Sequence, residues 1–310
     1  MSQHFPWELA QKRSLPLDIK ISMTKMRIQQ WYLFHGGDVY VSFSGGKDST
    51  VLLHIARQLY PDIPTVYCDT GLEYPELREF VKTIDNVTWL KPEMNFRKVI
   101  ENYGYPVVSK ETSQKIYEVR HTHSEKLRNI RLYGEGHSSS KIAERWKFLI
   151  DAPFEVSHKC CEVMKKRPFR KYEKTTGFHP IVATMAEESE LRKQSWLKYG
   201  CNAFGMKRPM SRPMSFWTEC DVLEYLLTYD VPYASVYGEI VEDEKNGLKT
   251  TGCQRTGCMF CMYGCHMEPS PNKFQRMAQT HPTIYHYCMK PWNEGGLGLA
   301  DVLNFIGIEH

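Results

Sequence analysis

The residues best suited to chemistry stand at positions 44–49, which read SGGKDS and follow an apolar stretch at 39–43. Adjacent glycines let the backbone turn sharply, so that several N–H groups can point at one anion. A second apolar run, at 51–56, predicts a helix whose N-terminus adds the positive end of its dipole. Lys47 adds a full charge, and the neighbouring serines add hydroxyl groups. The segment is therefore predicted to bind the phosphate groups of a ligand, with an ordinary strand-to-helix turn as the alternative. It is not a Walker loop, which has four residues between its first glycine and its Gly-Lys pair.

Cysteines form the second group of chemically active residues, and the chain has ten of them. An adjacent pair stands at Cys160 and Cys161, and four more lie at 253, 258, 261 and 265. The C-x-x-C unit at 258–261 can chelate a metal from a tight turn, so these four alone suit zinc or an iron–sulfur cluster. Neighbouring cysteines seldom share one zinc ion, but they can reach two corners of an iron–sulfur cube. The residues by themselves leave both alternatives open. The isolated cysteines are expected to be small buried apolar residues: Cys68, Cys201, Cys220 and Cys288.

Strands and helices that would position these residues alternate along the chain. Apolar runs predict strands at 39–43, 65–68 and 87–90, and a later one at 179–184. Apolar periodicity and capping residues predict helices at 19–34, after the SGGKDS segment to about residue 60, from 75, at 96–103 and at 218–227. This alternation predicts an α/β fold with a doubly wound parallel sheet. After residue 247 the periodicity fades, and turns that carry cysteines are expected.

The predicted sheet places two polar segments together. Ligands of parallel sheets bind beyond the carboxyl ends of the strands, where the strand order switches. The segments 44–49 and 69–73 each follow a predicted strand, so we expect both at one edge of the sheet. The polar segment 110–147 is predicted to be a helical insertion that covers this edge, with a structural spacer as the alternative.

Composition sets the class of protein. The 310 residues are 42% hydrophobic and 25% charged, which is typical of a globular protein with a sizeable core. The polar first thirteen residues and the lack of a long apolar run argue against secretion and membrane insertion, so a cytoplasmic protein is expected. The net charge of +4 is too small to indicate a nucleic-acid partner. Residues 159–174, however, hold seven Lys or Arg against two Glu, which suits an acidic substrate or a nucleic-acid backbone.

Five segments together resemble a known family. SGGKDS resembles the pyrophosphate-loop (PP-loop) motif of the adenine nucleotide alpha hydrolases. Four further segments are similar to motifs of the phosphoadenosine phosphosulfate (PAPS) reductase family: DTGLEYPE at 69–76, KCCEVMKKRP at 159–168, the P-x-x-x-W-T-x-x-D-V-x-x-Y pattern at 213–225, and GCMFC at 257–261. In this order they identify the chain as a member of that family, most similar in pattern to the ATP pyrophosphatase of DNA phosphorothioation. The resemblance implies a PP-loop nucleotide domain at 1–235, with the helical insertion at about 110–150, and a cysteine-rich extension at 236–310.

The resemblance also implies a cluster. In assimilatory adenylyl-sulfate reductases and in the phosphorothioation enzyme, a tandem cysteine pair and a distal C-x-x-C hold a [4Fe–4S] cluster. By position, the ligands here are Cys160, Cys161, Cys258 and Cys261. Cys253 and Cys265 are then extra, and a zinc site made from 253, 258, 261 and 265 is the alternative.

The implied activity is cleavage of ATP to AMP and pyrophosphate, which adenylates an acceptor so that sulfur can replace the activated oxygen. Lys47 and Asp48 are the implied catalytic residues, and Mg²⁺ would bridge the phosphates with Asp48 or Asp69 as a ligand. Sulfur would arrive as sulfide or as a persulfide from a partner such as a cysteine desulfurase. A DNA phosphate, a tRNA base and a small metabolite are all open as acceptors. The implied nucleotide-binding residues are Ser44, Gly45, Gly46, Lys47, Asp48, Ser49, Asp69, Thr70 and Arg192.

Two departures from the reductase pattern favour ATP over a sulfonucleotide. Reductases need a mobile nucleophilic cysteine, carried in a C-terminal ECG-x-H tail, and here no cysteine follows Cys288. The segment TMAEESELR at 184–192 keeps the Glu, the Ser and Arg192 of the family's G-x-R-x-x-E-S-x-x-R pattern but lacks its first arginine. The alternatives are a PAPS or adenosine phosphosulfate (APS) reductase with a non-standard nucleophile, and a nucleotide-binding redox regulator without catalysis.

Overall fold

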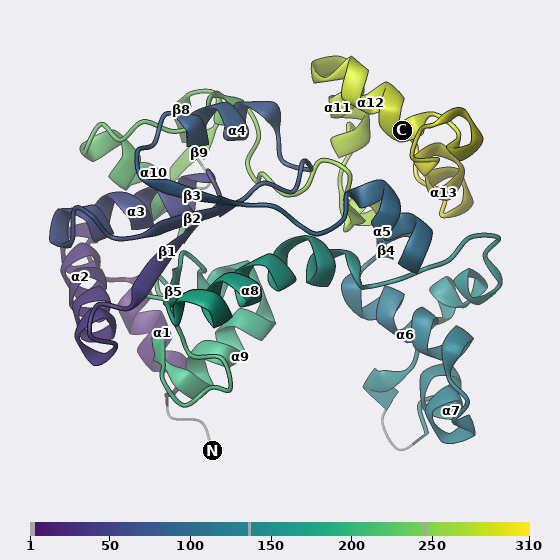
Figure 1. Cartoon of the computed structure of the whole chain (residues 1–310), viewed down its shortest axis with the longest axis horizontal. Coiled ribbons are helices and arrows are strands. Elements are labelled where there is room, and N and C mark those ends of the chain that lie inside the picture. Colours follow the sequence, from purple (N-terminus) through teal and green to yellow (C-terminus); the bar gives the residue numbers. More distant parts are fainter. Residues whose placement is uncertain (1–3, 136–137, 245–246) are drawn as a thin grey trace. The chain divides into compact units, whose positions relative to one another are not determined.

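The computed structural model describes residues 4–135, 138–244 and 247–310 (Figure 1). The chain divides into two compact units, and each is discontinuous in sequence. The first unit comprises Met1–Asp69, Glu73–Lys91 and Pro168–Thr256, and the second comprises Thr70–Leu72, Pro92–Arg167 and Gly257–His310. The division into domains at residue 235 stays a prediction, because compact units need not coincide with domains that fold separately.

The first unit contains a mostly parallel sheet. Among the described residues this sheet has six strands in the order β3-β2-β1-β5-β7-β6, and only β6 runs antiparallel to its neighbour. From β1 the chain first adds strands on one side (β2, β3) and then on the other (β5, β7, β6), so the switch in strand order lies between β1 and β5. The predicted α/β class is therefore confirmed. The strands are β1 (Val39–Phe43), β2 (Thr65–Cys68), β3 (Val87–Leu90), β5 (His179–Val182), β6 (Asn202–Ala203) and β7 (Met210–Ser211).

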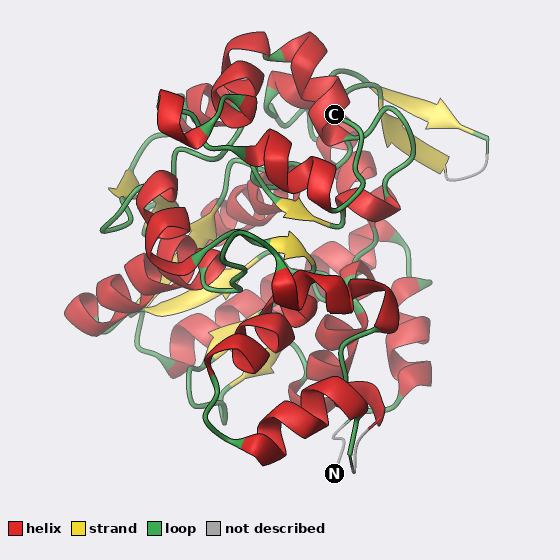
Figure 2. Cartoon of the chain, turned by 90° about the vertical axis from the view of Figure 1, so that its right-hand side faces the viewer, coloured by secondary structure: helices red, strands yellow, loops and turns green. Residues whose placement is uncertain are grey.

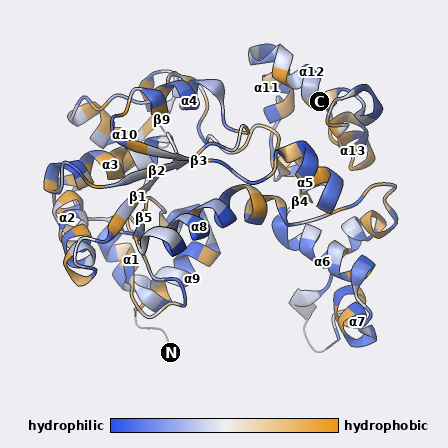
Figure 3. Ribbon diagram, in the orientation of Figure 1, coloured by the Kyte–Doolittle hydropathy of each residue, from blue (hydrophilic) through white to orange (hydrophobic). Residues whose placement is uncertain are grey.

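The hydrophobic core of this unit surrounds β1. Val39, Tyr40 and Val41 are fully buried, as expected for a central parallel strand covered on both faces. Figure 3 shows the hydrophobic colour along this strand. Helix α3 (Lys47–Leu59) packs on β1 and also contacts α2 (Leu17–Phe34) and α10 (Glu219–Thr228). Each Leu, Ile or Val side chain buried in this way stabilises the fold by about 1.5–3 kcal/mol.

The capping box predicted at the start of α10 is present. The Thr218 hydroxyl accepts the Asp221 N–H at 3.3 Å, and the Asp221 carboxylate accepts the Thr218 N–H at 2.6 Å. The same carboxylate binds the buried ammonium of Lys20 at 2.7 Å, which ties α2 to α10. The remaining helices of the unit are α1 (Pro6–Arg13), α4 (Pro75–Lys82), α8 (Arg167–Thr176), which belongs here from Pro168 onward, and α9 (Glu190–Tyr199). A hairpin of β8 (Ile240–Asp243) and β9 (Gly247–Thr250) completes it.

The second unit is mainly helical. In Figure 2, which draws the whole chain, helices are red and strands are yellow. The predicted helical segment at 110–150 contains α6 (Lys110–His121), α7 (Glu125–Tyr133) and a 3₁₀ helix at Glu144–Asp151. Gly134 ends α7 with a left-handed φ of 79°, and residues 136–137 lie outside the described residues. That the insertion covers the nucleotide edge stays a prediction. The unit also contains α5 (Phe96–Tyr103) and a parallel pair of β4 (Val107–Val108) with β10 (Met262–Tyr263).

The expectation that only turns follow residue 247 is wrong. Besides β9, the chain forms α11 (Lys273–Thr280), α12 (Pro282–Met289) and α13 (Leu299–Phe305). These helices have seven or eight residues, which is too short for a clear apolar period. A signal was present at the first of them, because Asn272 and Gln275 form a capping box.

Within the described part of the chain, no helix is long and apolar enough to span a membrane. The expected cytoplasmic location stays a prediction.

Candidate active site and cysteine group

The SGGKDS segment connects the carboxyl end of β1 to the first turn of α3, as its sequence predicts. Gly45 has a left-handed φ of 73°, and a Cβ atom there would lie 2.8 Å from a methyl group of Val81. Only glycine fits this turn without strain. Gly46 is the N-cap of α3, and a Cβ atom there would lie 3.3 Å from the Tyr237 hydroxyl. The two glycines therefore bring the backbone N–H groups of a helix N-terminus to an edge of the sheet, where an anion is stabilised.

The serine hydroxyls hold the shape of this loop. The Ser49 hydroxyl accepts the Ser44 N–H at 3.1 Å and donates to the Gly46 carbonyl at 2.9 Å. The hydroxyls of Ser44 and Ser49 are 3.0 Å apart. These bonds join the two ends of the loop, so the N–H groups are positioned before a ligand arrives.

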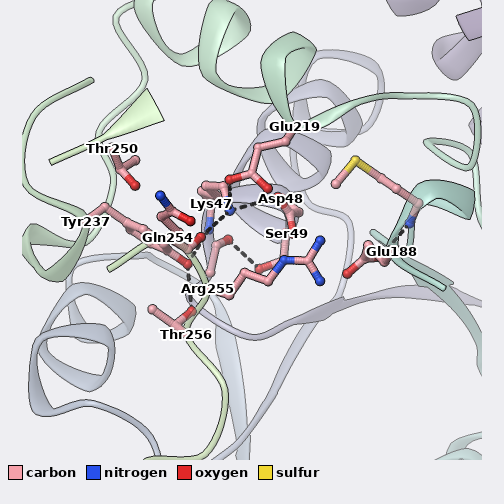
Figure 4. Close-up of polar contacts among 12 residues, drawn as sticks. Lys47, Asp48, Ser49, Glu188, Glu219, Tyr237, Thr250, Gln254, Arg255 and Thr256 are labelled. Atoms are coloured by element: carbon pink, nitrogen blue, oxygen red, sulfur yellow. Dashed lines mark hydrogen bonds and ion pairs between the residues drawn. The ribbon is translucent and has the colours of Figure 1, made fainter. Parts of the chain in front are cut away.

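Lys47 is the buried cation of the site, with only 3% of its surface exposed. Its ammonium donates to the Gln254 carbonyl at 2.9 Å and lies 3.3 Å from the Glu219 carboxylate and 3.8 Å from that of Asp48 (Figure 4). Its backbone N–H donates to the Tyr237 hydroxyl at 3.2 Å. The lysine is thus held rigidly at the helix N-terminus by groups far away in sequence.

Asp48 and Glu219 provide oxygen ligands beside Lys47. Burial raises the pKa of the Asp48 carboxyl; the Lys47 charge opposes this effect, and the Glu219 charge adds to it. The Oδ1 atom of Asp48 is buried and accepts no hydrogen bond in the described structure. Mg²⁺ in nucleotide sites is held by one or two carboxylates and by substrate phosphates. The pair therefore fits this ion, even though no three His, Cys, Asp or Glu side chains among the described residues could enclose one.

Arg192 adds a second positive charge on this side of the site. It forms an ion pair with Glu188, and the Ser189 hydroxyl caps α9 by accepting the Arg192 N–H at 3.3 Å. Burial lowers the pKa of the Arg192 guanidinium, the nearby charge of Arg255 lowers it further, and Asp48 opposes both. The three motif residues Glu188, Ser189 and Arg192 thus act together.

The remaining two predicted residues have different surroundings. Asp69 follows β2, the strand next to β1, and its carboxylate accepts a hydrogen bond from Arg78 at 3.0 Å. Thr70 belongs to the second unit, where its hydroxyl accepts the Leu72 N–H at 3.2 Å. The structure therefore brings together residues 44–49, whereas Asp69 is engaged by Arg78.

Sequence reasoning missed the groups that contact Lys47 from later in the chain. Glu219 stands directly after the helix cap Thr218, and Gln254, Arg255 and Thr256 precede the C-x-x-C segment, but no spacing rule connects either place to the loop. No pattern in the sequence pointed to Tyr237. The missed residues are Glu219, Tyr237, Gln254, Arg255 and Thr256.

The four cysteines of the expected cluster all lie in the second unit. Cys160 and Cys161 start a helix that continues as a π-helix over Glu162–Lys166, a feature frequent at functional sites. Burial raises the pKa of Cys160, and the charges of Cys161, Cys258 and Cys261 raise it further. The pKa of Cys261 is raised by burial and by Cys161. Two segments that are distant in sequence thus bring their thiols within electrostatic range of one another.

This donor set is of the kind that an iron–sulfur cluster takes, because a [4Fe–4S] cube is held by four cysteine thiolates. Burial raises the pKa of Cys161 and the Cys258 charge raises it further, while Lys165 and Lys110 lower it. Because metal ligands must be deprotonated, binding of a cluster would release the thiol protons.

The other cysteines divide between the two units. Cys265 is in the second unit and donates to the Cys261 carbonyl at 3.5 Å, whereas Cys253 is in the first unit and donates to the Arg255 carbonyl at 3.0 Å. Cys288 is fully buried, and burial raises its pKa to about 12, so it is not a mobile nucleophile. Of the isolated cysteines, Cys68, Cys201 and Cys288 are buried as predicted, whereas Cys220 is partly exposed on α10.

The chain is similar to several known proteins. The family model described as phosphoadenosine phosphosulfate reductase domain matches residues 38–107 and 106–263. An adenosine 5'-phosphosulfate reductase of Geobacillus kaustophilus is 24% identical over 256 residues, covering 82% of this chain and 86% of the relative. A phosphoadenosine 5'-phosphosulfate reductase of Alteromonas mediterranea is 41% identical over 68 residues, 21% of this chain and 27% of the relative. The crystal structure of a phosphoadenylyl-sulfate reductase from Candida auris, a phosphate complex, aligns with a TM-score of 0.40 at 12% identity, covering 72% of this chain and 89% of that one.

Proposed function

The chain belongs to the phosphoadenosine phosphosulfate reductase domain family, and from this premise we propose that it is an ATP pyrophosphatase that adenylates an acceptor for sulfur transfer. Residues 44–49 bind the phosphates, Lys47 and Asp48 act at the reacting phosphate, and Asp69, Thr70 and Arg192 complete the nucleotide site. The acceptor oxygen attacks the α-phosphorus, the bond from that phosphorus to the bridging oxygen breaks, and pyrophosphate leaves. A sulfur nucleophile then displaces AMP from the acceptor.

The single observation that carries the proposal is the position of Lys47. Its ammonium is buried at the N-terminus of α3, 3.3 Å from the Glu219 carboxylate and 3.8 Å from that of Asp48, and it donates to the Gln254 carbonyl. Fixed positive charge at that point stabilises the negative charge that develops on a departing pyrophosphate. Asp48 and Glu219 would hold Mg²⁺, which supplies further neutralisation of the phosphates.

The cysteine group supports a [4Fe–4S] cluster held by Cys160, Cys161, Cys258 and Cys261. With four protein ligands such a cluster has no open iron, so we assign it a structural or electrostatic role.

Nucleic acid is one proposed acceptor class, and the first unit has a basic cavity that would bind its backbone at the edge of the sheet opposite the SGGKDS loop, away from the reacting phosphate. A cavity of about 860 Å³ opens beside the amino-terminal end of β5 and is lined by four basic side chains and one acidic one. The acid, Glu173, is already bound by Arg208 and by the Tyr40 hydroxyl. The basic residues that line the cavity are Arg170, Lys174, Lys207 and Arg208. Binding of nucleic acid that weakens steeply with salt would support this acceptor class. The sulfur donor is proposed to be free sulfide, or a persulfide-carrying partner whose disulfide bond to the acceptor is then cleaved by a thiol to leave sulfur on the acceptor.

Calorimetry on anaerobically prepared protein tests the proposal. ATP with Mg²⁺ should bind, PAPS and APS should bind negligibly, and pyrophosphate should be released when an acceptor is present. Lys47→Ala should lower turnover by at least about a hundredfold, since removal of one group that stabilises transition-state charge has that effect. Lys193→Ala removes a partly exposed lysine of α9 and should leave turnover unchanged. Equal pyrophosphate release by wild type and Lys47→Ala would overturn the proposal, and binding without turnover would indicate a regulator.

A sulfonucleotide reductase is the second candidate, because the relatives are named as reductases and because Cys253 is partly exposed. Cys253 stands next to Gln254, whose carbonyl binds Lys47. If this candidate is correct, Cys253→Ser abolishes sulfite release from APS or PAPS while Cys288→Ser does not. If ATP is the substrate, Cys253→Ser leaves pyrophosphate release intact.

A further inference from the structure

The segment 250–256, here called the cap segment, is fixed at both of its ends, and one of these ends contacts the SGGKDS loop. At its start, the Cys253 N–H donates to the Val236 carbonyl at 2.9 Å, and the Thr250 hydroxyl donates to the Cys253 carbonyl at 3.1 Å. A Cβ atom on Gly252 would lie 2.5 Å from the Val236 carbonyl, so the close approach requires glycine. The cap segment therefore has one defined position on the chain that leads into it.

At its other end the cap segment contacts the phosphate loop itself. The Gln254 carbonyl accepts from the Lys47 ammonium at 2.9 Å. The Thr256 hydroxyl lies 2.6 Å from the Tyr237 hydroxyl, which in turn accepts the Lys47 N–H. Both neighbours of Arg255 in sequence are thus connected to Lys47, one directly and one through Tyr237. These bonds confine the backbone of Arg255 at the loop.

The Arg255 side chain is the one cation of this group without an internal partner. Lys47 is paired with Glu219, and Arg192 is paired with Glu188. Among the described residues the Arg255 guanidinium makes no hydrogen bond or ion pair, and the residue is exposed. Figure 4 shows its side chain extending away from Tyr237, on the side where Asp48 and Glu188 are labelled.

Arg255 is also close enough to its charged neighbours to act on them. Burial raises the pKa of the Asp48 carboxyl, and the charges of Arg255 and Arg192 are among those that lower it. Burial lowers the pKa of Arg192, and the Arg255 charge lowers it further. The charges of the two guanidinium groups therefore act on each other and on Asp48, and an anion bound at the loop would be attracted by both of them.

We propose that Arg255 is a phosphate ligand of the nucleotide site and that it binds the phosphate chain together with Lys47 and Arg192. This inference rests on the proposed function, because it assumes a nucleotide at the loop. A guanidinium presents a planar fork of donors that matches two phosphate oxygens, which an ammonium cannot do. The ligand class is a nucleotide that carries a chain of phosphate or phosphosulfate groups, and a nucleoside without such a chain gains nothing from Arg255.

Binding measured by calorimetry on the full anaerobic chain tests this role, with ATP·Mg²⁺ and adenosine as probes. Arg255→Gln should weaken ATP·Mg²⁺ binding by at least about tenfold, the range expected for a lost charge-assisted hydrogen bond. Adenosine binding should change less than twofold, and Arg255→Lys should recover part of the loss. Lys193→Gln, which removes a partly exposed charge next to Arg192, is the matched control and should leave both affinities unchanged. Thermal unfolding of Arg255→Gln should match wild type, because the side chain is exposed.

The outcomes separate this inference from the proposed function. If wild type binds ATP, Lys47→Ala loses it and Arg255→Gln does not, the role of Arg255 is wrong and the function stands. An equal loss for adenosine and ATP would also overturn the role, since it would indicate a disturbed fold. If wild type prefers APS or PAPS, the same loss with that nucleotide supports Arg255 while the ATP assignment fails. A wild type that binds no nucleotide overturns both.

Discussion

The ammonium of Lys47 lies 2.9 Å from the backbone carbonyl of Gln254, although 207 residues separate the two in sequence. The lysine belongs to the first turn of α3, and the glutamine belongs to the cap segment that precedes the C-x-x-C motif. A side chain with 3% exposure cannot rely on water, so its charge is balanced by this carbonyl and by Glu219. The SGGKDS loop and the cap segment therefore form one hydrogen-bonded group, and a substitution in either segment is expected to disturb the other.

Tyr237 should contribute to stability through its hydroxyl. The group accepts the Lys47 N–H at 3.2 Å and contacts the Thr256 hydroxyl at 2.6 Å. Burial raises the pKa of Tyr237 to about 12, so the hydroxyl keeps its proton at neutral pH. Tyr237→Phe should lower the free energy of unfolding by about 1 kcal/mol, the typical value for a lost hydrogen bond. Urea unfolding gives this number.

Tyr233→Phe is the control for that measurement. This tyrosine lies near Tyr237, with ring centroids 6.4 Å apart, and is only partly buried. Its variant should unfold at the wild-type urea concentration. Equal effects of the two substitutions would contradict the role assigned to the Tyr237 hydroxyl.

The sequence predicts those parts of the site that are local in the chain. The two glycines, Lys47 and the hydroxyls of the loop lie within six residues, and a strand–turn–helix pattern is enough to place them at the edge of a parallel sheet. The capping boxes at Thr218 and Asn272 are equally local. Glu219, Tyr237 and Arg255 reach the loop only through tertiary packing, which leaves no spacing to detect. The two-residue strands β6 and β7 are likewise too short for an alternating pattern.

The buried ion pair of Lys20 and Asp221 should be important for the stability of the first unit. Their charged atoms are 2.7 Å apart, and Lys20 is 2% exposed. Lys20→Met leaves the carboxylate of Asp221 buried without its cation, which costs about 3–5 kcal/mol in comparable pairs. The capping bonds from Thr218 should keep the cost near the lower end. Chemical denaturation of the variant measures it.

An exposed ion pair provides the comparison for Lys20. Lys82 and Glu79 are 2.6 Å apart on the surface of α4, with about half or more of each side chain exposed. Lys82→Met should cost less than about 1 kcal/mol, because water screens and replaces such a pair. Similar losses for the two lysine variants would show that burial does not govern the Lys20 pair.

His35 should make the fold sensitive to acid. Its ring stacks on that of His179, with centroids 3.7 Å apart, and burial together with the His179 charge lowers the pKa of His35 to about 4 despite the opposing Asp38. The unfolded chain takes up a proton at this histidine near pH 6.5, whereas the folded chain does so only near pH 4. More protons are therefore bound in the unfolded state between these values, so stability falls as the pH is lowered from 6.5 towards 4.

Thermal unfolding across that pH range isolates the contribution of His35. His35→Gln should reduce the slope of the midpoint temperature against pH between 6.5 and 4, even if the variant is less stable at pH 7. His123→Gln, at an exposed position of the second unit, should keep the wild-type slope. An unchanged slope in His35→Gln would assign the acid sensitivity to other groups.

The cysteine group should bind iron rather than zinc. Burial and the neighbouring thiols make it unfavourable to ionise Cys160 in the metal-free protein, and a bound cluster would compensate for this. Protein prepared without oxygen should contain about four irons and four labile sulfides per chain, as expected of a [4Fe–4S] centre with four cysteine ligands. Cys258→Ala should lose most of this iron. Cys265→Ser should retain it, because Cys265 is assigned no ligand role although it contacts the Cys261 carbonyl. Stoichiometric zinc without iron would replace the cluster with the zinc alternative built on residues 253–265. Equal iron loss in both variants would contradict the ligand set, because Cys265 would then be needed as much as Cys258.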